Sequence, residues 1–276
     1  MTDTSPPRPA IQLDRVQVGY DRRVVCDDLS LDVPTGSYTA IIGPNACGKS
    51  TMLRSIARIL PYRSGSILLD GEEISRIPTR SLATRLGLLP QTSLAPEGIR
   101  VADLVARGRH PHQRAFDRWS HADEDIVAEA MRATGISGLS GRLVDELSGG
   151  QRQRVWVAMV LAQQTPVLLL DEPTTFLDIT HQYGLLELFE VLRRDLDRTV
   201  VIVLHDLNQA ARYASHLIVM KDGDIVTAGR PSEIITEELI EDVYSLRCRI
   251  FPDPETGAPM VIPRRPRQDS NLRPAL

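Results

Sequence analysis

The sequence predicts an α/β fold built on a central parallel sheet, and three observations carry this prediction. An apolar run at residues 40–42 leads into a glycine-containing loop and then into a helix-like pattern of apolar residues from 52 to 60. Two more apolar runs, at residues 167–170 and 199–204, have the length and composition of buried parallel strands. Both end in polar residues, as expected at the carboxyl edge of such a sheet, where α/β folds place their ligands.

The loop after the first run has the pattern of a phosphate-binding loop. Its nine residues are Gly43, Pro44, Asn45, Ala46, Cys47, Gly48, Lys49, Ser50 and Thr51. The glycines allow backbone N–H groups to point at a polyphosphate, and the dipole of the following helix favours the anion. Lys49 adds charge near the outer phosphates, and Ser50 offers a hydroxyl to magnesium. The sequence therefore predicts a nucleoside triphosphate site.

The basic residues of the chain agree with this prediction. Lys49 and Lys221 are the only lysines, and every other basic side chain except histidine is arginine. A compact ammonium fits between phosphate oxygens and loop carbonyls, whereas a planar guanidinium does not. Chance alone can also place one of two lysines in the loop, so this observation supports the motif without replacing it.

Length and composition limit the class of protein. The 276 residues can bury a sizeable core, and a net charge of −4 gives no general attraction to nucleic acid. The chain has no run of about 18 apolar residues, and its proline-rich start lacks the apolar core of a secretory signal, so we expect a cytosolic protein held at a membrane by a partner. Three cysteines without metal-ligand spacing fit reduced thiols.

The N-terminal part has strand periodicity. Residues 1–10 are expected to be a flexible tail, and alternating apolar residues at 11–33 predict short antiparallel strands. Tyr20 ends the first strand, where its ring can stack on an adenine or lie half-buried at a sheet edge. A further strand at residues 86–89 ends near Gln91, whose amide can reach a metal or water beside the phosphates or can belong to the ordinary surface.

Helical periodicity replaces strand periodicity at about residues 95–165. Within this segment Ser148, Gly149, Gly150 and Gln151 begin a helix, where a hydroxyl and backbone N–H groups form a second anion site. One molecule has no obvious use for two such sites. They become useful together when two copies face each other head to tail.

Acidic and histidine residues follow the later apolar runs. Asp171 and Glu172 come directly after residues 167–170, so one carboxylate can hold magnesium through water while the other orients an attacking water. Asp178 precedes the next helix. His205 follows the last buried run and can bond a γ-phosphate or the water, although a histidine in this place is more often a capping or packing residue.

The C-terminal part begins with a predicted hairpin at residues 217–226 and a helix through residues 234–243. Prolines and arginines dominate residues 252–276, which we expect to form a flexible tail. The packed domain therefore spans residues 11–251.

The ordered set of motifs resembles the ATP-binding subunit of ABC transporters over roughly residues 11–250. The set consists of GPNACGKST, Gln91, LSGGQ, VLLLDE, Asp178 and His205. Four other segments, VARGRHPHQ, DEPTTFLDITHQ, HDLNQAARYASHLI and VYSLRCRI, resemble more narrowly the iron-siderophore importers of the ferric-enterobactin type. The resemblance implies a P-loop NTPase fold of the ABC ATPase kind, with a RecA-like core, an N-terminal antiparallel β subdomain and an inserted α-helical subdomain.

The resemblance also implies which residues bind nucleotide and metal. Tyr20 would stack on adenine, and residues 43–51 would cradle the phosphates of ATP. Ser50 and Gln91 would meet Mg²⁺, and Asp171 would hold the same ion through water.

The remaining implied roles concern hydrolysis and a second copy. Glu172 would act as general base, and His205 would contact the γ-phosphate. Residues 148–151 would close on ATP held by the other copy, with Asp178 across the dimer interface. Phe176 departs from many relatives, which carry a smaller residue there, and it can alter the packing of the dimer.

The implied function is ATP hydrolysis coupled to ferric-siderophore uptake, by a peripheral subunit on the cytoplasmic face of the inner membrane. Permease subunits would dock near Gln91 and the helical segment, and a periplasmic or lipid-anchored binding protein would deliver the chelate. Import of cobalamin or haem stays open, because this subunit does not touch cargo. A soluble ABC protein acting on DNA or ribosomes fits less well because it needs a coiled-coil insertion or a second cassette. A P-loop kinase or GTPase has no place for LSGGQ, and an exporter usually brings its own membrane helices.

Overall fold

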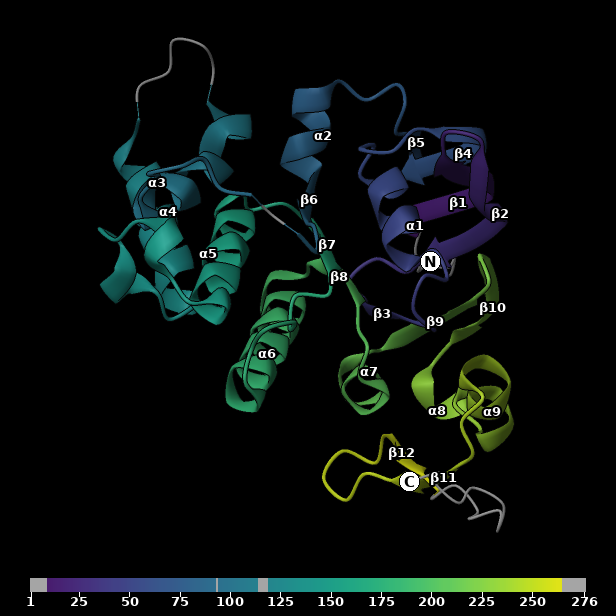
Figure 1. Cartoon of the computed structure of the whole chain (residues 1–276). Helices are drawn as coiled ribbons and strands as arrows, with labels where there is room; N and C mark the ends of the chain where they lie inside the picture. The colour runs from purple at the N-terminus through teal and green to yellow at the C-terminus, as the bar shows by residue number, and fades with distance from the viewer. Residues whose placement is uncertain (1–8, 93, 114–118, 265–276) are drawn as a thin grey trace, which may run out of the picture.

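The computed structural model describes residues 9–92, 94–113 and 119–264 (Figure 1). A β subdomain lies on one side of a central parallel sheet, and a helical subdomain lies on the other. The α/β class predicted from the sequence is therefore confirmed.

The central sheet has six strands in the order β10-β9-β3-β8-β7-β6. Their bounds are β3 Tyr38–Ile42, β6 Leu86–Leu89, β7 Val167–Asp171, β8 Thr199–Val203, β9 His216–Lys221 and β10 Asp224–Gly229. All neighbouring pairs are parallel except β9 and β10. Every residue of β3, β7 and β8 is buried, because helices and the second sheet cover both faces.

This strand order brings the predicted motifs to one edge. The strands β3, β8, β7 and β6 are consecutive neighbours, so their carboxyl ends lie side by side. From these ends the chain enters the phosphate loop, His205, the acidic pair and Gln91, in that order across the sheet. Helix α1, Lys49–Ile56, begins inside the loop, and α6, Ile179–Leu196, and α7, Leu207–Tyr213, follow β7 and β8.

The N-terminal sheet is antiparallel, as predicted, with the order β2-β1-β4-β5. Its strands are β1 Ile11–Tyr20, β2 Arg23–Val33, β4 Tyr62–Leu69 and β5 Glu72–Glu73. Inward residues of this sheet pack with Met52, Leu53 and Ile56 of α1. The second sheet therefore supports the helix that begins at the phosphate loop.

The helical subdomain follows α2, Thr79–Arg85, and β6. It contains α3 Val101–Ala106, α4 His121–Ala133 and α5 Gly149–Ala162, with short 3-10 helices at Arg107–His112, Ser137–Leu139 and Val144–Glu146. A buried ion pair from Arg109 Nε to Asp123 Oδ1, 2.8 Å long, ties the first 3-10 helix to α4. Across the described ranges, no helix combines the length and apolar character needed to cross a bilayer.

The C-terminal part differs from the prediction in two places. The single expected helix is two, α8 Pro231–Ile234 and α9 Glu237–Tyr244, because the Thr236 side chain caps a new helix by accepting a hydrogen bond from the Leu239 N–H at 3.1 Å. The flexible tail expected from residue 252 is wrong in its first part. There β11 Cys248–Pro252 and β12 Pro259–Pro263 form a hairpin, with prolines at the strand ends and Val261 only 4% exposed. The N-terminal tail expected at residues 1–10 is also wrong at its end, because Ala10 is buried and its N–H donates to the Val33 carbonyl at 2.9 Å. The expected tail residues 1–8 and 265–276 lie outside the described ranges.

Candidate functional site

The phosphate loop has the backbone that its glycines predict. Gly43 and Gly48 have φ values of 153° and 105°. A Cβ on Gly43 would lie 2.2 Å from the Met220 carbonyl oxygen, so only glycine fits there. The Lys49 ammonium lies over the loop and donates to the Gly43 and Pro44 carbonyls at 2.9 and 2.7 Å. A positive charge is thus fixed at the centre of the loop.

Ser50 and Asp171 meet beside the loop, as predicted. Ser50 Oγ donates to Asp171 Oδ1 at 2.8 Å. Asp171 is 1% exposed, and its second oxygen is enclosed with no hydrogen-bond partner of normal geometry in the described part of the chain. Burial raises the pKa of Asp171, although the Ser50 hydroxyl acts in the opposite direction. A hydroxyl beside an unpaired carboxylate oxygen fits a hard divalent cation such as Mg²⁺.

Two predicted residues from distant segments converge at Glu172. Gln91 Nε2 donates to Glu172 Oε2 at 2.7 Å, and His205 Nε2 lies 2.7 Å from Glu172 Oε1. Glu172 is 8% exposed and has a φ of 54°, so an unusual backbone conformation turns its carboxylate toward these partners. The carboxylate that follows Asp171 is thus oriented by an amide and an imidazole.

One cavity of about 570 Å³ is lined by Lys49, Ser50, Gln91, Glu172 and His205. Asp171 does not line it but reaches it through its hydrogen bond with Ser50. Tyr20 stands at its wall, 40% exposed, and its hydroxyl accepts a hydrogen bond from Arg54 at 3.2 Å. Two lining residues, Arg23 and Val25, were not predicted from the sequence as part of the site. The signal for them is the tight turn after Tyr20, which brings the start of β2 back beside the end of β1.

The other predicted anion site is a separate pocket of about 340 Å³. Ser148 caps α5: its Oγ accepts from the Gln151 N–H at 3.3 Å, and Gln151 Oε1 accepts from the Ser148 N–H at 3.1 Å. Phe176 lines this pocket and is 79% exposed. Arg154, one helical turn after Gln151, also lines it and was missed.

Asp178 lies in the same pocket, where its side chain caps the start of α6. Its Oδ1 accepts from the His181 N–H at 2.9 Å and lies 2.7 Å from His181 Nδ1. These contacts lower the pKa of Asp178. His181 was missed from the sequence, since nothing in its spacing distinguishes it from a surface histidine.

The two pockets share no residue. One lies where α1 begins, and the other lies where α5 begins, on the side of the helical subdomain (Figure 1). Within the described chain, Ser148 and its neighbours therefore do not complete the cavity that contains Lys49.

A phosphate loop, an acidic pair and a second helix N-terminus on an inserted helical subdomain define an ATP-binding cassette. The family described as "ABC transporter" matches residues 26–175, more than half of the chain. The chain therefore belongs to the ABC transporter family, as its ATP-binding, ATP-hydrolysing component.

The chain is similar in sequence to ATP-binding proteins of particular transport systems. The chain is 53% identical over 250 residues to the ferric enterobactin transport ATP-binding protein FepC of Escherichia coli (strain K12), covering 91% of this chain and 92% of that protein. It is 49% identical to the probable siderophore transport system ATP-binding protein YusV of Bacillus subtilis (strain 168), over 92% of both chains. A cobalamin import ATP-binding protein, BtuD of Halobacterium salinarum (strain ATCC 29341 / DSM 671 / R1), is 38% identical over 87% of this chain and 60% of that protein.

Solved structures of ABC transporter proteins have the same fold as this chain. A metal-chelate type ABC transporter in an inward-facing conformation matches with a TM-score of 0.78 and 26% identity, covering 94% of this chain and 98% of that chain. The dimeric structure of a bacterial ABC transporter cassette matches with a TM-score of 0.73 and 25% identity, covering 80% and 98%.

Proposed function

We propose that two copies of this chain bind ATP between them, head to tail, and that hydrolysis drives ferric-siderophore uptake through permease subunits of the cytoplasmic membrane. The observation that supports this dimer is the separation of the two anion sites on one chain. In a head-to-tail pair, residues 148–151 and Asp178 of one copy face the phosphate loop of the other. A dimeric relative among the solved structures supports the formation of a dimer.

The cavity suits ATP in each of its parts. Tyr20 would stack on the adenine, residues 43–51 would hold the phosphates, and Lys49 would leave its loop carbonyls for phosphate oxygens. Ser50 and Asp171 would hold Mg²⁺, with Gln91 beside them. The bound ion would neutralise charge on the phosphates.

Glu172 would serve as the general base for hydrolysis. The water oxygen bonds to the γ-phosphorus, the bond from that phosphorus to the bridging oxygen of ADP breaks, and the water proton passes to the Glu172 carboxylate. Gln91 and His205, each 2.7 Å from one of its oxygens, would orient the carboxylate. The same imidazole would contact the γ-phosphate when ATP is bound.

A ferric siderophore is the cargo that similarity favours. Relatives named for siderophores are 53% and 49% identical to this chain, whereas the cobalamin relative is 38% identical. The relatives are named as ATP-binding proteins of transport systems, which supports membrane permease subunits as partners. We place the complex at the cytoplasmic face of the inner membrane, with an external binding protein that delivers the chelate.

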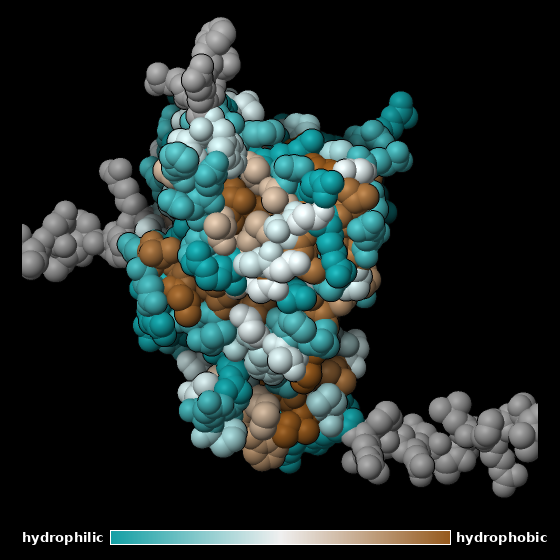
Figure 2. All heavy atoms as spheres, turned by 90° about the vertical axis from the view of Figure 1, so that its left-hand side faces the viewer, coloured by the Kyte–Doolittle hydropathy of each residue, from teal (hydrophilic) through white to brown (hydrophobic). Residues whose placement is uncertain are grey.

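The helical subdomain offers a surface for the permease. A groove of about 450 Å³ on α3 and α4 is lined by Ala102, Ala106, Val127, Met131 and Trp119 among others, and Trp119 is 41% exposed. Figure 2 views the molecule from this side, where brown hydrophobic surface is visible in patches among hydrophilic residues. We place permease docking on this side, near Gln91.

Two experiments test the function. Uptake of labelled ferric chelates should be lost in a strain that lacks this subunit and restored by the parent chain, and normal uptake without it would refute the transport function.

Lys49→Ala and Ser148→Arg should each abolish hydrolysis alone, but an equal mixture should regain activity. A mixed dimer contains one site with both Lys49 and Ser148 intact. A mixture as inactive as its parts would contradict the shared site.

A further inference from the structure

Helix α7 begins directly after His205 and Asp206 and has only seven residues. So short a helix is unstable alone and takes its position from its surroundings. The Asp206 side chain caps it by accepting hydrogen bonds from the Asn208 and Gln209 N–H groups at 2.8 and 2.9 Å. The placement of α7 therefore fixes the backbone on the C-terminal side of His205.

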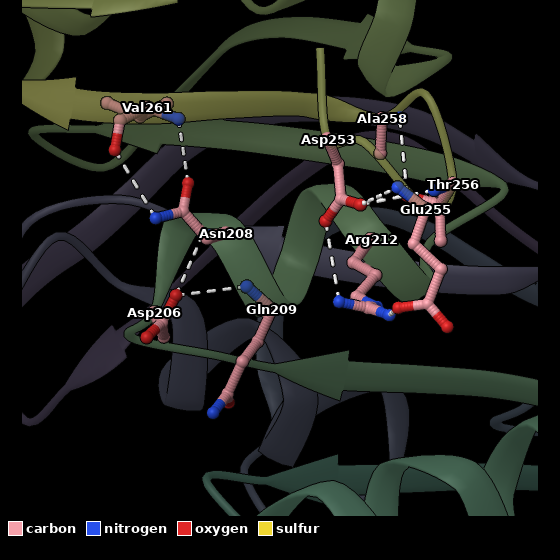
Figure 3. A network of polar contacts seen from close by, with 9 residues as sticks. All are labelled: Asp206, Asn208, Gln209, Arg212, Asp253, Glu255, Thr256, Ala258 and Val261. Atoms are coloured by element: carbon pink, nitrogen blue, oxygen red, sulfur yellow. Dashed lines mark hydrogen bonds and ion pairs between the residues drawn. The ribbon is translucent and has the colours of Figure 1, made fainter. Parts of the chain in front are cut away.

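The C-terminal hairpin holds both ends of α7 (Figure 3). At the first end, the Asn208 amide pairs with the main chain of Val261 in both directions. The Val261 N–H donates to Asn208 Oδ1 at 2.7 Å, and Asn208 Nδ2 donates to the Val261 carbonyl at 3.3 Å. At the other end, Arg212 lies 3.4 Å from Asp253 and also contacts Glu255.

The hairpin is shaped to make these contacts. Its loop is closed by Asp253 Oδ1, which accepts from the Glu255 and Thr256 N–H groups at 2.8 and 3.1 Å. These N–H groups lower the pKa of Asp253. Val261 and Cys248 are 4% and 2% exposed and join the main core. Because a two-stranded hairpin is marginal alone, α7 and the hairpin stabilise each other.

On its opposite side, α7 contacts the segment that carries Asp178. Gln209 is 4% exposed, and its Nε2 donates to Gln182 Oε1 at 2.9 Å. Gln182 Nε2 in turn donates to the Leu177 carbonyl at 3.0 Å, one residue before Asp178. The helix that follows His205 thus lies between the hairpin and the loop that enters the second anion site.

We infer that Asn208 is a positioning residue for His205. Through Val261 it holds α7 so that His205 Nε2 stays 2.7 Å from Glu172 Oε1. This inference rests on the proposed function, in which His205 serves hydrolysis. Asn208 does not line the ATP cavity, so its loss affects turnover and not nucleotide binding.

The test compares ATP hydrolysis by full-length variants in a sensitive phosphate-release assay. Asn208→Ala should lower kcat by roughly tenfold and change the KM for Mg-ATP by less than about twofold, since a small displacement of a reacting group costs rate. His205→Ala is measured beside it. The double variant should be no slower than His205→Ala alone, because both changes act through one side chain.

Two further variants serve as controls for the effect of Asn208→Ala. Arg249→Ala removes an exposed hairpin contact to Glu237, 3.5 Å long, and should leave kcat and KM unchanged. Asn208→Asp keeps an acceptor for the Val261 N–H and adds a charge that the start of a helix favours. It should therefore stay folded, with an intermediate kcat, even if Asn208→Ala does not fold.

Three results would overturn the inference. The first is parental kcat in both Asn208 variants. The second is a loss that adds to that of His205→Ala, because it would show a general structural effect. The third is normal turnover by His205→Ala, which would remove the proposed role of His205 itself and is distinguishable from the other two.

Discussion

Replacing Glu172 by glutamine removes a charge from the centre of the site with almost no change in shape. Both carboxylate oxygens are engaged: Oε2 accepts from Gln91 Nε2 at 2.7 Å, and Oε1 lies 2.7 Å from His205 Nε2. A glutamine keeps one oxygen for Gln91 but presents an NH₂ group toward His205. Its amide cannot take a proton from water at neutral pH.

The expected effect is large on turnover and small elsewhere. A positioned general base contributes about 10²–10⁴-fold, so the variant should lose about 3–5 kcal/mol of transition-state stabilisation. One lost hydrogen bond costs about 1 kcal/mol of folding free energy, or roughly 2–4 °C in Tm for a chain of this size. Glu172 is among the groups that raise the pKa of Asp171, so its neutralisation leaves the metal site at least as easily ionised.

The assay is phosphate release beside nucleotide-binding titration. Glu190→Gln is the matched control, because Glu190 also uses both oxygens, contacting Arg193 at 2.8 and 2.6 Å, but lies outside the ATP cavity. The control should hydrolyse ATP like the parent. Turnover by Glu172→Gln within tenfold of the parent would refute the assignment of Glu172 as base.

Three other predictions address stability, acidity and access. Arg109→Met should cost about 3 kcal/mol in urea denaturation, since it leaves the buried Asp123 without its partner. Arg109 lowers the pKa of Asp123, so this stability is present above the unfolded pKa and is lost as pH falls through the folded pKa; a pH-independent loss would contradict this. Asp171→Asn should abolish hydrolysis yet raise Tm at pH 7, because burial raises the pKa of Asp171 and its charged form destabilises the fold above that pKa; a lower Tm would refute this. Alkylation of Cys47, 4% exposed but lining the cavity, should block ATP binding, and full binding by the modified chain would count against it.

Much of the site could be predicted because its parts are local. An apolar run that ends in Asp171 and Glu172 indicates a buried strand and places both carboxylates at its carboxyl edge. That Gln91 and His205 reach the same carboxylate depends on strand order, since β6 and β8 both neighbour β7. No local pattern contains this order, so only the family resemblance brought these residues together in advance.

The missed features depend on distant contacts. The proline-rich composition of residues 252–263 predicted a tail. The hairpin is held instead by the side-chain amide of Asn208 on α7, which is 53 positions before its partner Val261. Arg154 and His181 look like ordinary surface residues in the sequence. Only the folded chain places them beside Ser148 and Asp178.

The size of the ATP-bound particle tests the shared site most directly. Glu172→Gln with Mg-ATP, examined by light scattering, should have twice the chain mass of 30.6 kDa, and adding Ser148→Arg to the same chain should return it to a single chain. Single chains of Glu172→Gln at saturating Mg-ATP, even with the permease present, would contradict the account.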